Sequence, residues 1–283
     1  MEKTWLITGA SSGLGRAIAE TALRRGDRVI AAARDPRQLD DLVAHHQARL
    51  TPLRLDVTDR DALEGIAGQV GPIDILVNNA GYGFMSAVEE AAEQDIREQF
   101  EVNFFGVVTL TRAFLPMMRQ RGSGWIVNVS SAAGVVSGPA AAFYSGSKFA
   151  LEGFSEALAA EVAPLGIGVT IVEPGALRTD FAGRSLRWAA GSTDRYETVS
   201  RTRGYLARND GIQTGDPVRA AALIADAVGA PGAPLRLLLG SDCQQLVEKR
   251  LSDRLEEARA QKDSAASIAY DGTQADGLPT PFD

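Results

Sequence analysis

Residues 8–15, TGASSGLG, join a short apolar run to an amphipathic one near the start of the chain. The apolar residues 5–7 predict a strand, and residues 14–25 predict a helix with its apolar side chains on one stripe. Glycines at this junction allow a sharp turn, so the free N–H groups at the start of the helix face a pyrophosphate. The spacing is Gly-x-x-x-Gly-x-Gly, whereas the common dinucleotide motif is Gly-x-Gly-x-x-Gly. A tight turn without a ligand is the alternative, and the position at the first strand–helix junction favours a nucleotide.

Short apolar runs alternate with helical patterns along the rest of the chain. Gly26 follows the first helix, where a left-handed glycine is expected, and Asp59 is placed to begin a short helix. Strands separated by crossover helices imply a parallel sheet covered on both faces. We therefore predict a single α/β domain, a doubly wound, mostly parallel Rossmann-type sheet with helices on both faces. The other expected strands are residues 29–33, 53–57, 73–77, 125–129, 169–172 and 235–239, and the other helices lie within residues 89–121 (two helices), 144–164 and 217–228.

Two regions interrupt this alternation. Residues 182–216 are rich in small, polar and charged residues, and a stretch of this length without a clear strand is often a lid over a binding site. Residues 263–283 are small, polar and punctuated by proline, which predicts a loose C-terminal tail after a catalytic domain of residues 1–262. Residues 246–260 are charged and helical, and a partner is one surface on which such a helix would pack.

Composition limits the compartment and the partners. The 283 residues carry a net charge of −7, and an acidic chain is a poor candidate for nonspecific nucleic-acid binding. The single cysteine, Cys243, allows no internal disulfide and is compatible with a reducing compartment. No apolar run approaches the roughly 20 residues that cross a bilayer, and the first residues lack the pattern of a signal peptide. We expect a cytoplasmic protein with no integral membrane segment and no nucleic-acid partner. No metal site is expected, because His45 and His46 have no further ligand at metal spacing.

Tyr144 and Lys148 are four residues apart in a predicted helix and therefore share one face. A tyrosine hydroxyl has a reference pKa of about 10 and is a poor base at neutral pH. A lysine cation beside it stabilises the phenolate and lowers that pKa, which would suit Tyr144 to proton transfer. Tyr-x-x-x-Lys alone is common by chance, so the motif gains its weight only from its context.

That context resembles the short-chain dehydrogenase/reductase family over residues 4–181. The resemblance implies an oxidoreductase that moves a hydride between a nicotinamide and a carbonyl or alcohol, with Tyr144 as general acid or base. Ser131, 13 residues before Tyr144 as in the family, would hold the substrate oxygen. Lys148 would also hold the nicotinamide ribose, and Asn103 would keep a water in the proton relay. The shared motifs, in order, are the glycine turn, Asn-Asn-Ala-Gly at residues 78–81, Asn103, Ser131, Tyr144 with Lys148, and Pro174 with Gly175.

The same resemblance implies cofactor contacts along the chain. The glycine turn would line the phosphates and ribose, Asp56 would meet the adenine ring, and the segment from Pro174 to Thr179 would face the nicotinamide. Purely structural roles stay open for Asn78 and Asn79, because their amides would also tie adjacent strand ends together. The expected cofactor-binding residues are Gly9, Ser11, Ser12, Gly13, Leu14, Gly15, Arg34, Asp56, Val57, Asn79, Ala80, Gly81, Tyr144, Lys148, Pro174, Gly175 and Thr179.

The end of the second predicted strand favours NADP over NAD. NAD-binding proteins usually carry an acid there for the ribose 2′-hydroxyl, but this chain has Ala33 followed by Arg34. Arginine supplies a planar, permanently charged group that suits a 2′-phosphate, and Arg37 would assist it. Two alternatives stay open: Arg34 as a solvated loop residue, and Asp35 turning inward to restore NAD binding.

The residues expected around the substrate are mainly apolar, which favours a medium or large hydrophobic ketone or alcohol. Arg184 and Arg187 are interpreted as a solvated face of the lid rather than as an anion site. Cys243 has no histidine near it and is not expected to be a nucleophile. The expected wall residues are Tyr82, Phe84, Ala132, Val135, Val136, Phe143, Ala176, Leu177, Phe181 and Trp188.

Other functions on the same fold stay open. An NADP-binding sensor or scaffold without turnover would be favoured by loss of Ser131, Tyr144 or Lys148, and none is lost. An epimerase or isomerase that uses the cofactor transiently would cause no net change in nicotinamide absorbance. The family commonly pairs through the helices that correspond here to residues 103–121 and 144–164, which implies a homodimer or homotetramer.

Overall fold

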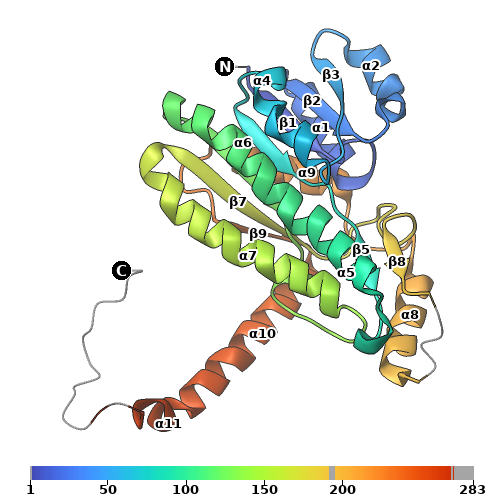
Figure 1. The fold of residues 1–283 in the computed structure, drawn as a ribbon, viewed down its shortest axis with the longest axis vertical. Helices are drawn as coiled ribbons and strands as arrows, with labels where there is room; N and C mark the ends of the chain where they lie inside the picture. The colour runs from blue at the N-terminus through green and yellow to red at the C-terminus, as the bar shows by residue number, and fades with distance from the viewer. Residues whose placement is uncertain (1, 191–194, 269, 271–283) are drawn as a thin grey trace.

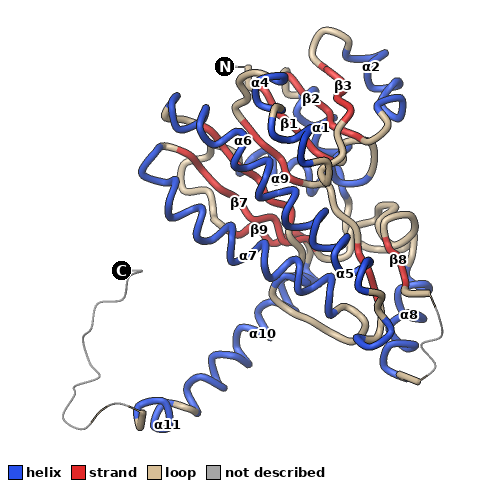
Figure 2. Tube along the Cα trace, viewed as in Figure 1, coloured by secondary structure: helices blue, strands red, loops and turns tan. Residues whose placement is uncertain are grey.

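The computed structural model describes residues 2–190, 195–268 and 270. Within them, seven parallel strands form one sheet in the order β3-β2-β1-β4-β6-β7-β9, with helices on both faces (Figures 1 and 2). The predicted single, doubly wound α/β domain is confirmed. The first strands are added to the sheet on one side of β1 and the later strands on the other side, so the strand order reverses between β1 and β4. Folds of this class bind ligands at that position. The strands are β1 (Thr4–Thr8), β2 (Arg28–Ala33), β3 (Leu50–Arg54), β4 (Ile75–Asn78), β6 (Gly124–Val129), β7 (Ile167–Pro174) and β9 (Arg236–Leu239).

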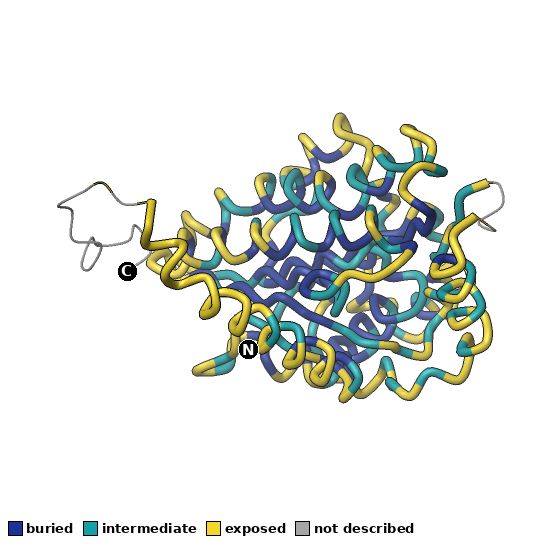
Figure 3. The backbone as a smooth tube through the Cα atoms, turned by 90° about the horizontal axis from the view of Figure 1, so that it is seen from below, coloured by how far each residue is buried: buried dark blue, intermediate teal, exposed yellow. Residues whose placement is uncertain are grey.

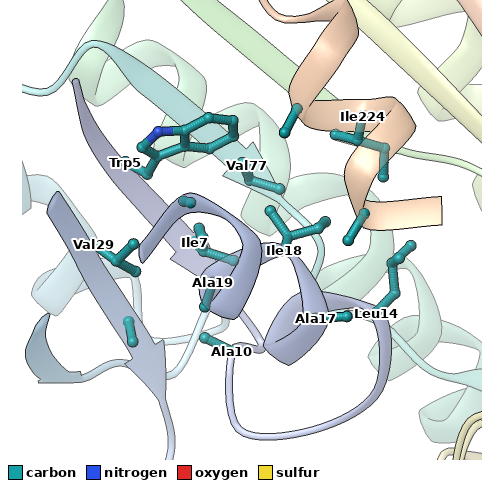
Figure 4. Packing of buried hydrophobic residues seen from close by; sticks show 14 of the residues in the cluster. Trp5, Ile7, Ala10, Leu14, Ala17, Ile18, Ala19, Val29, Val77 and Ile224 are labelled. Atoms are coloured by element: carbon teal, nitrogen blue, oxygen red, sulfur yellow. The ribbon is translucent and has the colours of Figure 1, made fainter. Parts of the chain in front are cut away.

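The helices cover the sheet in two layers. On one face, α1 and α9 pack on the strands, and Figure 4 shows Ile18 and Ile224 beside Trp5 and Val77. On the other face, α4, α6 and α7 contribute a second cluster that surrounds Phe114. The helices are α1 (Gly13–Arg24), α2 (Asp40–His46), α3 (Arg60–Glu64), α4 (Ile66–Val70), α5 (Glu93–Phe100), α6 (Gly106–Arg121), α7 (Ala142–Val162), α8 (Glu197–Asn209), α9 (Pro217–Ala227), α10 (Ser241–Ala260) and α11 (Lys262–Ala266).

Burial explains why the central strands are almost continuously apolar. Every residue of β4 is buried, because helices cover both faces of the sheet. Figure 3 shows the buried residues, in dark blue, gathered in the middle of the molecule. β3 is different: only Leu50 is buried and Leu53 is half-buried, and Pro52 lies inside the strand. An edge strand tolerates proline because one side of it makes no ladder hydrogen bonds. The prediction of residues 53–57 for this strand was therefore shifted, since the apolar pattern begins only after Pro52.

The segment expected to be a lid contains more structure than the sequence indicated. Leu186–Trp188 forms a short strand, β8, which pairs in parallel with β5 (Gly83–Met85). α8 follows, and residues 191–194 lie outside the described residues. The expectation of a stretch without a strand was wrong, because a three-residue strand is too short to show a period in the sequence.

The two helices predicted within residues 89–121 are joined without a loop. α5 runs into a π-turn, Glu101–Phe105, and this turn runs directly into α6. The N–H of Gly106 donates to the carbonyl oxygen of Glu101, five residues back, so one additional residue is accommodated within the helical path. Such turns often occur at functional sites.

The C-terminal part of the chain is more helical than expected. α10 begins at Ser241, five residues before the predicted start, and extends away from the body of the molecule (Figure 1). α11 occupies the beginning of the predicted tail, whereas residues 269 and 271–283 lie outside the described residues. Among the described residues, no helix is long and apolar enough to cross a membrane.

Candidate active site

A cavity of about 800 Å³ opens at the carboxyl ends of the strands. Its walls come from the segments that follow β1, β2, β4, β6 and β7, so residues far apart in the sequence meet at one place. Of the predicted site residues, Gly15 and Asn103 are not part of the wall. The others line it: Gly9, Ser11, Ser12, Gly13, Leu14, Arg34, Asp56, Val57, Asn79, Ala80, Gly81, Ser131, Tyr144, Lys148, Pro174, Gly175 and Thr179.

The glycine turn needs its glycines for two different reasons. Gly9 and Gly13 have φ angles of +65° and +55°, in the left-handed region that other residues avoid. A Cβ on Gly9 would also lie 3.0 Å from the Cα of Ala80. Gly15 lies behind the turn, where a Cβ would overlap the side-chain nitrogen of Asn79 and the carbonyl oxygen of Gly9. Gly15 thus allows α1 to pack closely on the turn.

Hydrogen bonds from Thr8 and Asn79 join the ends of β1 and β4. The Thr8 hydroxyl accepts from the backbone N–H groups of Asn79 at 2.9 Å and Ala80 at 3.0 Å, and it donates to the Val77 carbonyl oxygen at 3.3 Å. The Asn79 side-chain amide donates to the Thr8 carbonyl oxygen at 2.9 Å. Asn79 therefore ties two strand ends together and also faces the cavity.

Asn78 has a structural position instead. Its side-chain amide is buried and donates to Asn128 at 2.8 Å, and Asn128 donates to the Ser155 hydroxyl at 2.8 Å. Buried amides are costly unless they are paired in this way. Asn78 does not line the cavity.

The start of α1 has the properties of an anion site. Ser12, the N-cap residue, makes no side-chain capping hydrogen bond, and the first turn holds no acidic residue. The first N–H groups of a helix lack partners within the helix, and the helix dipole favours negative charge there. Together with the close backbone approach at Gly9 and Gly13, these residues fit the diphosphate of a nicotinamide dinucleotide.

Two aspartates beyond β3 have different roles. The Asp56 carboxylate lines the cavity and accepts hydrogen bonds from the N–H and the hydroxyl of Thr58, at 3.0 and 2.8 Å. Asp59 caps α3 by accepting from the N–H of Ala62 at 3.1 Å, as predicted. Asp56 is therefore the residue of the two that is available to the cavity.

Positive charge gathers where β2 and β3 end. Arg34 is exposed and has no ion-pair partner within the described part of the chain. The Asp35 carboxylate is held by Arg37, whose Nε and Nη2 donate at 2.9 and 2.8 Å, and this pairing lowers the pKa of Asp35. Arg54 lines the same hollow as Arg34. Sequence reasoning missed Arg54, since only the β2–β3 pairing brings it beside Ala33.

The catalytic candidates meet on one wall of the cavity. Ser131 lies two residues after the end of β6 and caps the following turn. Its hydroxyl accepts a hydrogen bond from the N–H of Ala133 at 3.1 Å. Tyr144 and Lys148 lie in the first two turns of α7 and are both buried. The centroid of the Phe181 ring lies 5.9 Å from that of the Tyr144 ring. A phenol, a hydroxyl and an ammonium group thus converge from two elements.

The electrostatics of this wall differ from the sequence prediction. Burial raises the pKa of Tyr144, and a hydrogen-bonding interaction with Ser131 opposes the rise. Burial also lowers the pKa of Lys148 to about 8, against the attraction of Glu152. The Lys148 ammonium donates to the carbonyl oxygen of Val129 at 2.8 Å. The expected lowering of the Tyr144 pKa by Lys148 is therefore corrected: desolvation is the larger effect on the phenol.

Asn103 lies in the π-turn and is buried behind the cavity. Its side-chain nitrogen donates to the Tyr82 carbonyl oxygen at 2.9 Å, and its oxygen accepts from the N–H of Tyr82 at 3.1 Å. Gln99, one turn earlier, binds the same carbonyl oxygen at 2.8 Å and accepts from the N–H of Phe84 at 2.6 Å. These two amides hold the segment that follows β4, and sequence reasoning missed Gln99.

Only some of the residues expected around the substrate line the cavity. Six of the ten expected wall residues line it: Tyr82, Ala132, Val136, Ala176, Leu177 and Phe181. The other four do not, which corrects the prediction. Phe84 packs on Phe143 with ring centroids 6.3 Å apart, Val135 packs on α10, and the ring of Trp188 lies under Arg203. Further wall residues that the sequence did not indicate are Met85, Val102, Tyr205, Leu206, Asp242 and Leu246.

Two arginines of the lid segment also reach the cavity. Arg184 pairs with Asp180, and Arg187 pairs with Glu98 at 2.9 Å while it lies over the Tyr82 ring at 4.6 Å. Both arginines are about half or more exposed, as expected of a solvated face, but they are already paired with acids.

A buried acidic cluster lies behind Lys148. Glu173 of β7 is fully buried, and burial raises its pKa to about 7. Glu152 of α7 is nearly as buried, and burial raises its pKa as well. Arg236 of β9 lies 3.3 Å from Glu152 and 3.4 Å from Glu173, and it also pairs with the exposed Glu156 at 2.8 Å. Arg236 thus lies within ion-pair distance of two buried carboxyl groups.

Comparison with known proteins agrees with this geometry. The sequence profile of the family described as short chain dehydrogenase matches residues 3–190. The chain belongs to the short-chain dehydrogenase family. An oxidoreductase of Botryotinia fuckeliana is 42% identical over 254 residues, which are 88% of this chain and 93% of that protein. A 3-ketodihydrosphingosine reductase of Bacteroides thetaiotaomicron is 36% identical over 252 residues, 87% of this chain and 91% of the relative.

Solved structures of short-chain dehydrogenases share the fold. One from Streptomyces avermitilis is 44% identical, with a TM-score of 0.90 that covers 95% of this chain and all of the other. A Burkholderia phymatum member in complex with NAD is 26% identical, with a TM-score of 0.80 over 90% of this chain and 95% of the other. A metagenomic member in complex with NADP is also 26% identical, with a TM-score of 0.67 over 84% and 96%. Both nucleotides therefore occur among short-chain dehydrogenases of similar structure.

Proposed function

We propose that this short-chain dehydrogenase is an NADP-dependent oxidoreductase that acts on a hydrophobic carbonyl or alcohol, with Tyr144 as general acid and base. One observation carries the proposal: Tyr144, Ser131 and Lys148 line the same cavity as the glycine turn. A nicotinamide bound in this cavity supplies or accepts the hydride.

Each catalytic residue has a defined task in this proposal. Tyr144 donates its phenolic proton to the carbonyl oxygen during reduction, and it takes the proton back during alcohol oxidation. Ser131 hydrogen-bonds the same oxygen and so keeps it within reach of the phenol. Lys148 places a positive charge between the strand end and the cavity, where it binds a ribose hydroxyl. Asn103 positions Gly81 and Tyr82, which border the cavity.

The protonation state of Tyr144 suits the role of a general acid. Because burial raises the pKa of Tyr144, the phenol stays protonated at neutral pH and is ready to act as an acid. The opposite direction would first require a base that removes this proton.

Charge at the end of β2 supports NADP as the cofactor. Arg34 and Arg54 line one hollow. The acid of that hollow, Asp35, is already paired with Arg37. A 2′-phosphate would meet two guanidinium groups there. If Asp35 left Arg37 and turned to the ribose, NAD would be the better ligand, so this preference is tested directly below.

The apolar wall supports a hydrophobic substrate. Leu177, Phe181, Tyr205 and Leu206 line the cavity together with Tyr144. The relative from Bacteroides thetaiotaomicron is named for reduction of a ketone on a sphingoid base, which is consistent with a medium or large hydrophobic ketone here. Because Tyr205 and Leu206 belong to α8, we also propose residues 182–216 as a lid over the substrate.

The proposal extends to the state of the protein in the cell. A single buried cysteine supports a reducing compartment such as the cytoplasm. Phe105 is 44% exposed beside Phe104 at the start of α6, and an aromatic surface of this kind supports pairing of two copies into a homodimer or homotetramer.

The deciding experiment follows nicotinamide absorbance with the purified protein, NADPH or NADH, and a panel of hydrophobic ketones and aldehydes. We expect turnover with NADPH, weaker turnover with NADH, and loss of turnover in Tyr144→Phe. If both nucleotides bind and no ketone is reduced, a non-catalytic sensor or an isomerase becomes the better explanation. Full turnover by Tyr144→Phe would contradict the assignment of the acid.

A further inference from the structure

The C-terminal helix α10 begins at the active site. It starts at Ser241, directly after β9, and only its first two turns touch the cavity before it extends away from the molecule (Figure 1). Asp242 and Leu246 are the residues of these turns that line the cavity. They are four positions apart in the sequence, so they lie on one face of the helix.

Asp242 holds the turn that follows β7. Its carboxylate accepts a hydrogen bond from the N–H of Ala176 at 2.7 Å. A Cβ on Gly175 would overlap both carboxylate oxygens, so the carboxylate lies directly against the Gly175 backbone. The N–H of Gly175 also donates to the Leu239 carbonyl oxygen at 2.8 Å. The conformation of residues 175–176 is therefore fixed by β9 and α10, more than 60 residues later in the chain.

Asp242 is an acidic residue in the first turn of α10. The positive end of the helix dipole favours a negative group there. A charged acceptor makes a stronger hydrogen bond with an N–H group than a neutral one does. The Asp242 carboxylate accepts this bond from the N–H of Ala176 at the edge of the cavity.

Leu246 is held in place by its buried neighbours. Cys243 and Val247 on the same helix are almost fully buried and pack against Val135, in the segment that follows Ser131. Leu246 itself is 51% exposed and lines the cavity. An exposed leucine on a firmly anchored turn is well placed to contact an apolar ligand.

We propose that the first two turns of α10 are part of the active site, where Asp242 positions the Gly175–Ala176 turn and Leu246 sets the size of substrate that is accepted. The inference rests on the proposed function, since it assigns the cavity to a nicotinamide and a hydrophobic ketone. Asp242 is a positioning residue, and Leu246 is a specificity residue.

Leu246 is tested by substrate selectivity. Leu246→Ala enlarges the cavity, and we expect the ratio of kcat/KM for a bulky ketone over a small one to rise about tenfold or more, with the opposite change in Leu246→Trp. Leu251→Ala is the matched control, because Leu251 lies on the same helix with 53% exposure and does not line the cavity. Equal selectivity of the Leu246 and Leu251 variants overturns this assignment.

Asp242 is tested by nucleotide binding, which needs no turnover. We expect Asp242→Ala to weaken NADPH binding about tenfold in a titration, because the turn loses a charge-assisted hydrogen bond. Asp242→Asn keeps an acceptor oxygen and should recover most of the affinity. Asp253→Ala is the control, since Asp253 pairs with Lys249 farther along α10. An Asn variant as weak as the Ala variant, or an Ala variant that binds normally, overturns the positioning role.

The outcomes separate this inference from the proposed function. If the wild-type protein reduces ketones and the α10 variants behave like their controls, only the inference fails. If the wild-type protein binds NADPH and reduces no ketone, the proposed function fails, and the titration still decides the role of Asp242. If it binds no nicotinamide nucleotide, both fail.

Discussion

The Lys148 ammonium donates a hydrogen bond to the Val129 carbonyl oxygen, and this 2.8 Å contact fixes the cation at the end of β6. Val129 lies two residues before Ser131, so the bond links the helix that carries Tyr144 to the strand that leads into Ser131. The geometry of the catalytic wall therefore depends on a lysine that is both buried and charged, and its protonation should be visible in the kinetics.

The first prediction concerns pH. The pKa of Lys148 is lowered to about 8, so the cation is present below that pH and is lost above it. We expect kcat/KM for ketone reduction to be level between pH 6 and about 7.5, and to fall above about pH 8, because this parameter reports the free enzyme. A pH series with NADPH and one ketone measures it.

A pair of variants on α7 tests the cause of that pH dependence. Glu152 raises the pKa of Lys148, so Glu152→Gln should move the alkaline fall to lower pH. Glu156 pairs with the same Arg236 and is 64% exposed, so Glu156→Gln should leave the profile unchanged. If both variants keep the wild-type profile, Lys148 is not the titrating group.

The second prediction concerns Tyr144. Replacement of the phenol by a phenyl ring removes the proton donor and little volume, so Tyr144→Phe should lower kcat for reduction by about 10²- to 10⁴-fold. NADPH affinity should stay within about twofold, because the nucleotide meets mainly the backbone and the arginines in the proposed mode. Tyr196→Phe, at an exposed position that does not line the cavity, should keep full activity.

The third prediction concerns the nucleotide. Arg34→Ala should reduce the ratio of kcat/KM with NADPH to that with NADH by about tenfold or more, since one charge-assisted contact to the 2′-phosphate is lost. Arg54→Ala should act in the same direction. Arg97→Ala provides the control, because Arg97 pairs with Glu93 and lies outside both hollows. If Arg34→Ala does not change the NADPH-to-NADH ratio of kcat/KM, Arg34 does not bind the 2′-phosphate and is a solvated loop residue.

The fourth prediction concerns stability. The pKa of Glu173 is raised from 4.5 to about 7 by burial, so the folded state resists its ionisation. The associated stability is fully present below about pH 4.5 and is lost as the pH rises through 7. Glu173→Gln should therefore raise the melting temperature at pH 8 by a few degrees, and the gain should shrink at pH 5. Thermal melts at both pH values measure this, with the exposed Glu156→Gln variant expected to change little at either.

The sequence predicted those parts of the site that are encoded locally. The turn from Gly9 to Gly15 could be located because a strand, three glycines and a helix follow one another directly. Tyr144 and Lys148 share a face because helical spacing alone brings them together. Ser131 and Asn103 required the family resemblance, since nothing in their local sequence points to the cavity.

The remaining parts depend on tertiary structure. Arg54 joins Arg34 only through the register of two neighbouring strands. Glu152, Glu173 and Arg236 come from a helix and two strands, and their meeting changes their pKa values through burial that no local pattern encodes. Asp242 lies before the helix that the sequence predicts from residue 246, and only the fold brings it to Ala176.

The π-turn between α5 and α6 has a consequence for insertions and deletions. Each residue of an α-helix turns the chain by about 100°, so the additional residue sets the rotation of Gln99 relative to the buried side of α6. Deletion of Val102, Phe104 or Phe105 would leave a regular helix and keep every polar side chain of the site. Gln99 would then point about 100° away from Tyr82 and Phe84, and the loop at the cavity edge would lose the hydrogen bonds that Gln99 makes. In this segment the number of residues, as much as their identity, encodes the angle at which one half of the helix meets the other.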